Sequence, residues 1–237
     1  MLTKSEKFYF DGYGIGSFSE GENLDNINRS IDDIFTGRGN SGFFLEQKYP
    51  FSKDLRPTVY GYDESFIDIL FESDLPNKFK ETLGYDLFLA HIQCREVSSK
   101  TSNSYMQWHR DTHYYGKKLA GNAPPVHKVI FYPSVNGVTE PCLQIARGSH
   151  LRMSTDMKKD FSQLYHSEID TIASSNNKFV FFNTSLLHFP IIPSIGRGNI
   201  RVVYSFCHEF QLKKYPHQKE LHEIYKQKMI NYRRGDK

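Results

Sequence analysis

The sequence Phe88-Leu-Ala-His-Ile-Gln-Cys-Arg-Glu-Val97 begins the part of the chain that decides the fold. It is the first of six short runs rich in aromatic and β-branched residues, separated by turn residues such as Arg147-Gly-Ser-His150. Several short strands in series favour two packed β-sheets. We therefore expect a mainly β fold with flanking helices and a double-stranded β-helix (jelly-roll, cupin-like) core. The expected strands are Phe88–Val97, Tyr105–His109, His127–Tyr132, Cys142–Ala146, Phe179–Leu187 and Ile200–His208.

Outside this core the patterns favour helices. After a short opening strand within the aromatic, glycine-rich residues 8–18, apolar residues between 23 and 35 recur every three or four positions, which indicates a helix with one apolar face. Residues 63–71 and 75–83 show shorter versions of this pattern. We expect one domain over 1–237, with a helical N-terminal part (about 1–84), the jelly-roll core (about 85–210) and an amphipathic C-terminal helix (about 217–234). The helices should pack outside the core.

The composition and charge of the chain argue against a nucleic-acid-binding protein and against a membrane protein. The chain has 237 residues, a net charge of +3 and scattered basic residues, whereas a nucleic-acid surface requires a concentrated basic stripe. No run approaches the roughly 18 apolar residues of a membrane span, and the N-terminus lacks an apolar signal core. The three cysteines (Cys94, Cys142 and Cys207) form no Cys-x-x-Cys pair and are expected to be small apolar strand residues. These features predict a cytoplasmic protein in a reducing compartment that binds neither nucleic acid nor membrane.

The motif Trp108-His-Arg-Asp111 places two metal-binding side chains at positions i and i+2. In extended chain such positions share a face, so His109 and Asp111 can point at one ion. With 10 His and 27 acidic residues in 237, about one His-x-acid pair is expected by chance. His166-Ser-Glu168 is a second such pair. Its neighbours are polar and unpatterned, which indicates a solvated loop or helix.

Two further residues extend the motif to a recognisable set. His188 in Leu-Leu-His-Phe-Pro adds a second imidazole, and two imidazoles with one carboxylate leave three iron positions open for cosubstrate and dioxygen. Arg201 in Asn-Ile-Arg-Val-Val-Tyr can hold a dicarboxylate by a two-pronged hydrogen bond. Together they predict an enzyme that uses 2-oxoglutarate. Arg197 competes with Arg201 for the clamp, but Arg201 begins a β-branched run on a strand, whereas Arg197 lies in a glycine-flanked turn suited to touching substrate.

The chain resembles the phytanoyl-CoA dioxygenase family of iron(II)- and 2-oxoglutarate-dependent oxygenases. The resemblance rests on Phe10-Asp-Gly-Tyr-Gly-Ile15, the Trp-His-Arg-Asp motif, the segment Pro141-Cys-Leu-Gln-Ile-Ala-Arg-Gly-Ser-His150, and the later His188 and Arg201. It implies that His109, Asp111 and His188 bind Fe(II), that Arg201 binds the far carboxylate of 2-oxoglutarate, and that Gln93 lies near this cosubstrate. It also implies O2 as oxidant, ascorbate as a possible reductant, and hydroxylation of a small molecule. Ala146-Arg147 departs from the family's apolar-Pro pair.

Three alternatives remain open on the sequence. His109 and His113 have the spacing of a zinc-protease helix, but Arg110 stands where that motif requires glutamate. A non-catalytic jelly-roll binding module with a vestigial metal site is the second. A redox-neutral isomerase or hydrolase that uses the metal is the third. Neither the substrate nor the oligomeric state follows from the sequence.

Overall fold

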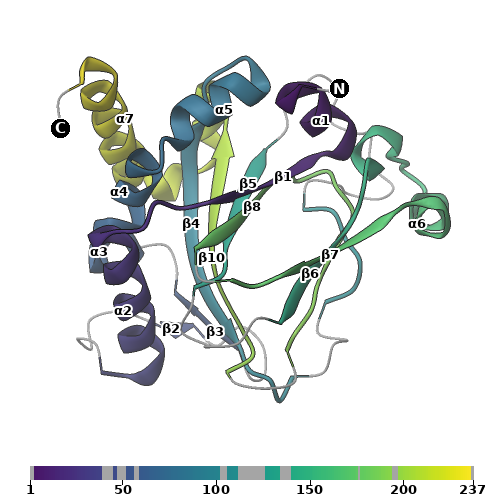
Figure 1. The fold of residues 1–237 in the computed structure, drawn as a ribbon, viewed down its shortest axis with the longest axis horizontal. Helices are drawn as coiled ribbons and strands as arrows, with labels where there is room; N and C mark the ends of the chain where they lie inside the picture. Colours follow the sequence, from purple (N-terminus) through teal and green to yellow (C-terminus); the bar gives the residue numbers. More distant parts are fainter. Residues whose placement is uncertain are drawn as a thin grey trace.

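The computed structural model describes residues 3–38, 45–46, 52–55, 59–101, 106–111, 126–133, 140–175, 177–193 and 197–235. Two antiparallel sheets form its centre (Figure 1). The larger runs in the order β1 (Tyr13–Ser17), β8 (Lys178–Asn183), β5 (His127–Phe131), β10 (Asn199–Cys207), β4 (Phe88–Val97), β3 (Ser52–Leu55), β2 (Leu45–Glu46), and the smaller in the order β7 (Ile169–Ala173), β6 (Pro141–Ala146), β9 (His188–Pro190). This is the jelly-roll core that the sequence predicts.

Alternate residues of the larger sheet face two different apolar clusters. On β10, Val203 packs between the two sheets with Ile130 and Phe182, whereas Val202 and Tyr204 pack against the helices. Because side chains alternate along a strand, the odd-numbered residues of β10 face the barrel interior. Polar side chains at these odd positions are therefore directed into the space between the sheets.

The helices cover the outside of the larger sheet. In Figure 1 α2 (Glu22–Thr36), α3 (Val59–Tyr62), α4 (Ser65–Glu72) and α7 (Lys219–Arg234) lie on the face away from the smaller sheet. The predicted apolar face of the C-terminal helix is confirmed, since Leu221, Tyr225 and Met229 are buried. The other helices are α1 (Lys4–Asp11), α5 (Leu75–Leu83), α6 (Met157–Ser162) and the short 3-10 helices at Ser149–Arg152, Gln163–His166, Glu209–Lys214 and Pro216–Gln218. No helix in the described part of the chain is long and apolar enough to cross a membrane.

The N-terminal part differs from the prediction in two ways. Residues 8–11 belong to helix α1, which a Thr3–Glu6 capping box begins and Gly12 ends with φ of 81°, so the opening strand is confined to β1. Strands β2 and β3 also come from this part and pair with β4. Besides the predicted opening strand, this part therefore contributes two further strands to the larger sheet, which form where β4 supplies a pairing partner.

Three differences concern the core strands. Strand β7 forms where a solvated loop or helix was expected; only Ile172 of its five residues is buried, so its sequence carries little strand pattern. The run predicted as Phe179–Leu187 ends at Asn183, whose side chain accepts a hydrogen bond from the Ser185 amide in a turn before β9. Residues 106–108 are not in a strand, and Tyr105 lies outside the described residues.

Candidate metal centre

The two histidines of the predicted site are held side by side by their own backbones. His109 and His188 form an isolated antiparallel bridge, in which each amide donates to the other's carbonyl at 3.0 Å. The Asp111 amide donates to the Thr184 carbonyl at 3.0 Å, which continues the pairing. Although His109 and His188 are 79 positions apart (188 − 109), the fold places them as direct neighbours at the edge of the smaller sheet.

The three candidate ligand side chains converge. One ligand atom from each of His109, Asp111 and His188 lies within 4.8 Å of the others. The Nε2 atom of His109 is 3.8 Å from Asp111 Oδ1, and that of His188 is 3.5 Å from Asp111 Oδ2. Among the described residues this is the group of His, Cys, Asp and Glu side chains arranged closely enough to hold a metal ion.

Hydrogen bonds at Nδ1 leave the Nε2 atom of both imidazoles available to bind a metal. His109 Nδ1 lies 2.8 Å from the Gln107 carbonyl, and His188 Nδ1 lies 3.0 Å from the Leu186 carbonyl. A carbonyl oxygen only accepts, so each Nδ1 carries a proton, and Nε2, the atom that faces Asp111, is the ring nitrogen left to bind a metal. Metal-bound histidines are commonly oriented in this way by a partner of the other ring nitrogen. The donor set therefore fits a divalent transition metal.

The charges of the site agree with this arrangement. Burial lowers the pKa of His188 to about 4, against an opposing effect of Asp111, so its ring is neutral near pH 7. Burial alone raises the pKa of Asp111, but the ammonium of Lys128 and then the two imidazoles outweigh it and bring the value to about 2. A neutral imidazole and an ionised carboxylate are the ligand forms that bind a metal without first losing a proton.

Arg110 lies between His109 and Asp111 in the sequence, and its side chain points to the opposite side of the chain, where it anchors this segment. Its Nε and Nη2 donate to Asp160 at 2.8 and 3.0 Å, its Nη1 bonds to the Ser185 carbonyl, and both charged side chains are fully buried. Asp160 also accepts from the Ser154 amide at 2.9 Å. Since neighbouring side chains of an extended segment point to opposite sides, fixing Arg110 fixes the direction of His109 and Asp111.

The Gly-Ser-His segment supports the second histidine. The buried Ser149 hydroxyl accepts from the amide of Leu187, the residue before His188, at 2.8 Å. Gly148, with φ of 67°, makes the turn that brings Ser149 to this position. His150 bonds through Nε2 to the Tyr9 carbonyl at 2.9 Å, so its contact is with helix α1. His150 belongs to the turn predicted from the sequence, in one of the segments that carry the family resemblance.

Lys128 is a member of the site that the sequence analysis missed. It lies on β5 at an interior-facing position, and its Nζ is 3.0 Å from Asp111 Oδ2. Oδ2 is buried and receives no hydrogen bond of regular geometry from the described residues, so the ammonium compensates its charge as an ion pair. The sequence pattern could have identified Lys128, because it is a charged residue at an inward position of the otherwise apolar run Lys-Val-Ile-Phe.

Arg201 lies on the interior face of β10 and is 7% exposed. Its Nη1 donates to the Asn199 side chain at 2.7 Å. Lys128 is paired in register with Ser205, four positions from Arg201 (205 − 201), which is about 13 Å along a strand. The interior thus carries a cation at the candidate metal centre and a guanidinium further along the same face. A dianion between them meets a positive group at each end.

Arg197, the competing candidate for the clamp, is occupied elsewhere. Its guanidinium pairs with Glu96 at 2.8 Å and with Asp32 of helix α2 at 2.7 Å. These contacts join the start of β10 to β4 and the helical layer, and give Arg197 a structural part in place of the expected substrate contact. Of the two arginines, Arg201 is the one on the barrel's inner face.

Gln93 also faces the interior, because it is paired in register with Val203 on β10. Its amide nitrogen donates to Asp54 Oδ1 at 3.0 Å. Asp54 is fully buried and pairs through both oxygens with Arg95, whose Nη2 lies 2.7 Å from Oδ2. This places Gln93 in a buried polar network beside Arg201, with its amide nitrogen already engaged.

Other residues from the sequence analysis lie away from the centre. Arg147 pairs with Asp170, Glu168 and Asp11, which explains the departure from the apolar-Pro pair as a surface ion-pair cluster. Cys94, Cys142 and Cys207 are buried strand residues, as expected. His113, of the zinc-protease spacing, lies outside the described residues.

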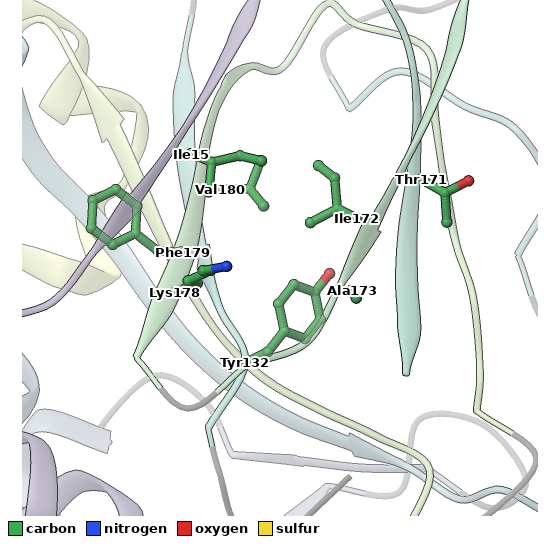
Figure 2. Close-up of a pocket in the computed structure, with 8 residues that line it drawn as sticks. All are labelled: Ile15, Tyr132, Thr171, Ile172, Ala173, Lys178, Phe179 and Val180. Atoms are coloured by element: carbon green, nitrogen blue, oxygen red, sulfur yellow. The ribbon is translucent and has the colours of Figure 1, made fainter. Parts of the chain in front are cut away.

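A separate pocket opens between the free edges of the two sheets, beside β1 and β8 on one side and β7 on the other (Figure 2). Its volume is about 170 Å³. Tyr132 extends into it with the hydroxyl toward Ile172 and Ala173 (Figure 2). Burial and, after it, Cys142 raise the pKa of Tyr132 well above its ordinary value, against an opposing effect of Arg201.

Comparison with known proteins supports the fold. No protein-family model and no curated protein sequence matches the chain. Among solved structures, the epimerase SnoN in complex with Fe3+, α-ketoglutarate and nogalamycin RO is similar with a TM-score of 0.64 at 11% identity, over 86% of this chain and 81% of SnoN. HygX from Streptomyces hygroscopicus with nickel and 2-oxoglutarate gives 0.61 at 10% identity, over 86% and 85% of the two chains.

EctD from S. alaskensis with bound Fe is similar with a TM-score of 0.62 at 11% identity, over 86% of this chain and 75% of EctD. Identities this low establish the fold and not the activity. In all three comparisons the similarity covers 86% of this chain. This protein therefore shares its jelly-roll fold with proteins that were solved with iron or nickel and with 2-oxoglutarate bound.

Proposed function

We propose that this protein is an iron(II)- and 2-oxoglutarate-dependent oxygenase that acts on a small molecule. The observation that carries the proposal is the convergence of His109, Asp111 and His188, with both Nε2 atoms directed at Asp111 and both Nδ1 atoms held by backbone carbonyls. Three protein ligands on one side of an iron leave adjacent positions open. When bound, iron supplies the oxidising chemistry that couples decarboxylation of the keto acid to oxidation of a C–H bond.

The remaining residues bind, orient and exclude water. Arg201 is suited to the far carboxylate of 2-oxoglutarate, because a buried guanidinium binds carboxylate by two parallel hydrogen bonds. The Arg110–Asp160 pair and Ser149 fix the two ligand segments from outside the centre. Gln93 completes the polar wall next to Arg201. In this assignment the protein orients the reactants, and no protein acid or base is required.

We further propose that the reaction is a hydroxylation and that the chain is related to the phytanoyl-CoA dioxygenase family. The presence of Asp111 supports hydroxylation, since family halogenases have a small residue there. Proteins of this fold include an epimerase and a carbocyclase, both α-ketoglutarate dependent. Identification of the oxidised product therefore tests whether the reaction is a hydroxylation. A small-molecule substrate is consistent with neighbours solved with nogalamycin RO and hygromycin B.

The test is formation of succinate from 2-oxoglutarate by protein reconstituted with iron(II) under air. We expect succinate from the wild type and none from His188→Ala, whose metal content should also fall. His166→Ala is the matched control, because His166 belongs to the other His-x-acid pair and is exposed on a 3-10 helix. Wild-type protein that binds no iron would favour the binding module, and anaerobic turnover without a keto acid would favour the redox-neutral enzyme.

A further inference from the structure

Lys128 occupies an unusual place for a lysine. It projects from β5 into the barrel, opposite Ser205 on one neighbouring strand and Phe182 on the other, and Phe182 packs against the His188 ring at 5.1 Å between centroids. Its side chain is 23% exposed, close to the 22% of Asp111 and the 28% of His109. Its contact with Asp111 places the ammonium at the candidate metal centre.

The ion pair of Lys128 with Asp111 is made to one carboxylate oxygen, Oδ2. Lys128 Nζ is 3.0 Å from Oδ2, which also lies 3.5 Å from His188 Nε2, and Oδ1 lies 3.8 Å from His109 Nε2. A carboxylate binds a metal through one oxygen or through both, and binding through both requires that neither oxygen is held by another partner. The ion pair with the Lys128 ammonium makes Oδ2 less available to bind the metal. Such partners of ligand residues orient the ligand and tune the metal.

We propose that Lys128 is a positioning residue that keeps Asp111 bound to the metal through a single oxygen and thereby keeps one coordination position open. This inference rests on the proposed function. With Asp111 bound through one oxygen, three protein donors and a chelating keto acid fill five of six octahedral positions, and the sixth accepts a further ligand. With Asp111 bound through both oxygens, all six positions are filled.

The test measures whether the sixth coordination position of the iron is open to a ligand. Wild type, Lys128→Met, Lys128→Arg and Lys178→Met are loaded with iron(II) and N-oxalylglycine, an unreactive analogue of 2-oxoglutarate, without air. Each is titrated with nitric oxide and followed by electron paramagnetic resonance. Nitric oxide is uncharged and needs one position, so loss of a positive charge alone does not alter its attraction to the site. Lys178 is an exposed lysine on the adjacent strand β8 and serves as the matched control.

We expect Lys128→Met to retain iron and N-oxalylglycine but to bind nitric oxide at least about tenfold more weakly, an effect of the size found for partners of metal ligands. Lys128→Arg, which keeps a cationic donor, should recover most of the affinity, and Lys178→Met should match the wild type. Nitric oxide binding by Lys128→Met at wild-type affinity would overturn the proposal for Lys128 alone. Failure of the wild type to bind iron or N-oxalylglycine would instead overturn the proposed function, and the Lys128 proposal with it.

Discussion

In the metal-free protein, replacing His188 by asparagine should remove a pH dependence of stability that the buried imidazole imposes. Burial lowers the pKa of His188 from 6.5 to about 4 in the folded chain. Between these values the unfolded chain binds a proton that the folded chain does not, so the free energy of unfolding falls as the pH falls. The contribution is fully present above pH 6.5. Asparagine keeps an amide donor for the Leu186 carbonyl but does not titrate.

The expected magnitude follows from the two pKa values. At pH 5 the folded imidazole is still mostly neutral. The unfolded imidazole is mostly protonated, because the pH then lies 6.5 − 5, or 1.5, units below its pKa. At about 1.4 kcal/mol for each whole step in pKa, His188 should cost about 2 kcal/mol of stability between pH 7.5 and pH 5. Asp111, with a pKa of about 2, stays ionised throughout this range.

The assay is urea unfolding of wild type and His188→Asn at several pH values, with a chelator present throughout. Other groups titrate in both proteins, so the difference between their free energies of unfolding isolates His188. Wild type should lose about 2 kcal/mol relative to the variant on going from pH 7.5 to pH 5. A difference that stays constant over this range would refute a neutral, buried His188 and, with it, the ligand form assigned to the site.

Three other changes test the residues around the centre. Arg201→Leu should raise the KM for 2-oxoglutarate by about a hundredfold, the equivalent of roughly 3 kcal/mol of charge-assisted hydrogen bonding, whereas Arg197→Leu should leave this KM nearly unchanged; similar effects would mean that the clamp is misplaced. Ser149→Ala should cost about 1–3 kcal/mol of unfolding free energy, because a buried backbone amide loses its acceptor, and a cost near zero by urea unfolding would contradict this. Asp160→Ala should cost about 3–5 kcal/mol, because it leaves Arg110 buried without its carboxylate; an unchanged midpoint of thermal unfolding would show that the pair is not essential.

Much of the architecture could be predicted from local patterns. Strand β4 and helix α5 have the predicted bounds, and the C-terminal helix buries the predicted face. These elements carry strong local signals, namely a long aromatic and β-branched run, a proline at a helix start, and apolar residues spaced three and four apart. The strands β2, β3 and β7 were missed because short, partly polar segments become strands only when a neighbour supplies the pairing.

The sequence by itself determined which side chains are available for the site: His109, Asp111 and His188 are chemically suited to iron, and Arg201 to a carboxylate. Only the tertiary structure decided which of them meet. The bridge between His109 and His188, the ion pair of Lys128 with Asp111, and the capture of Arg197 by Asp32 and Glu96 all join residues far apart in the chain. Such contacts depend on strand register and side-chain direction, which are set by packing of the whole barrel, whereas sequence patterns report only on near neighbours.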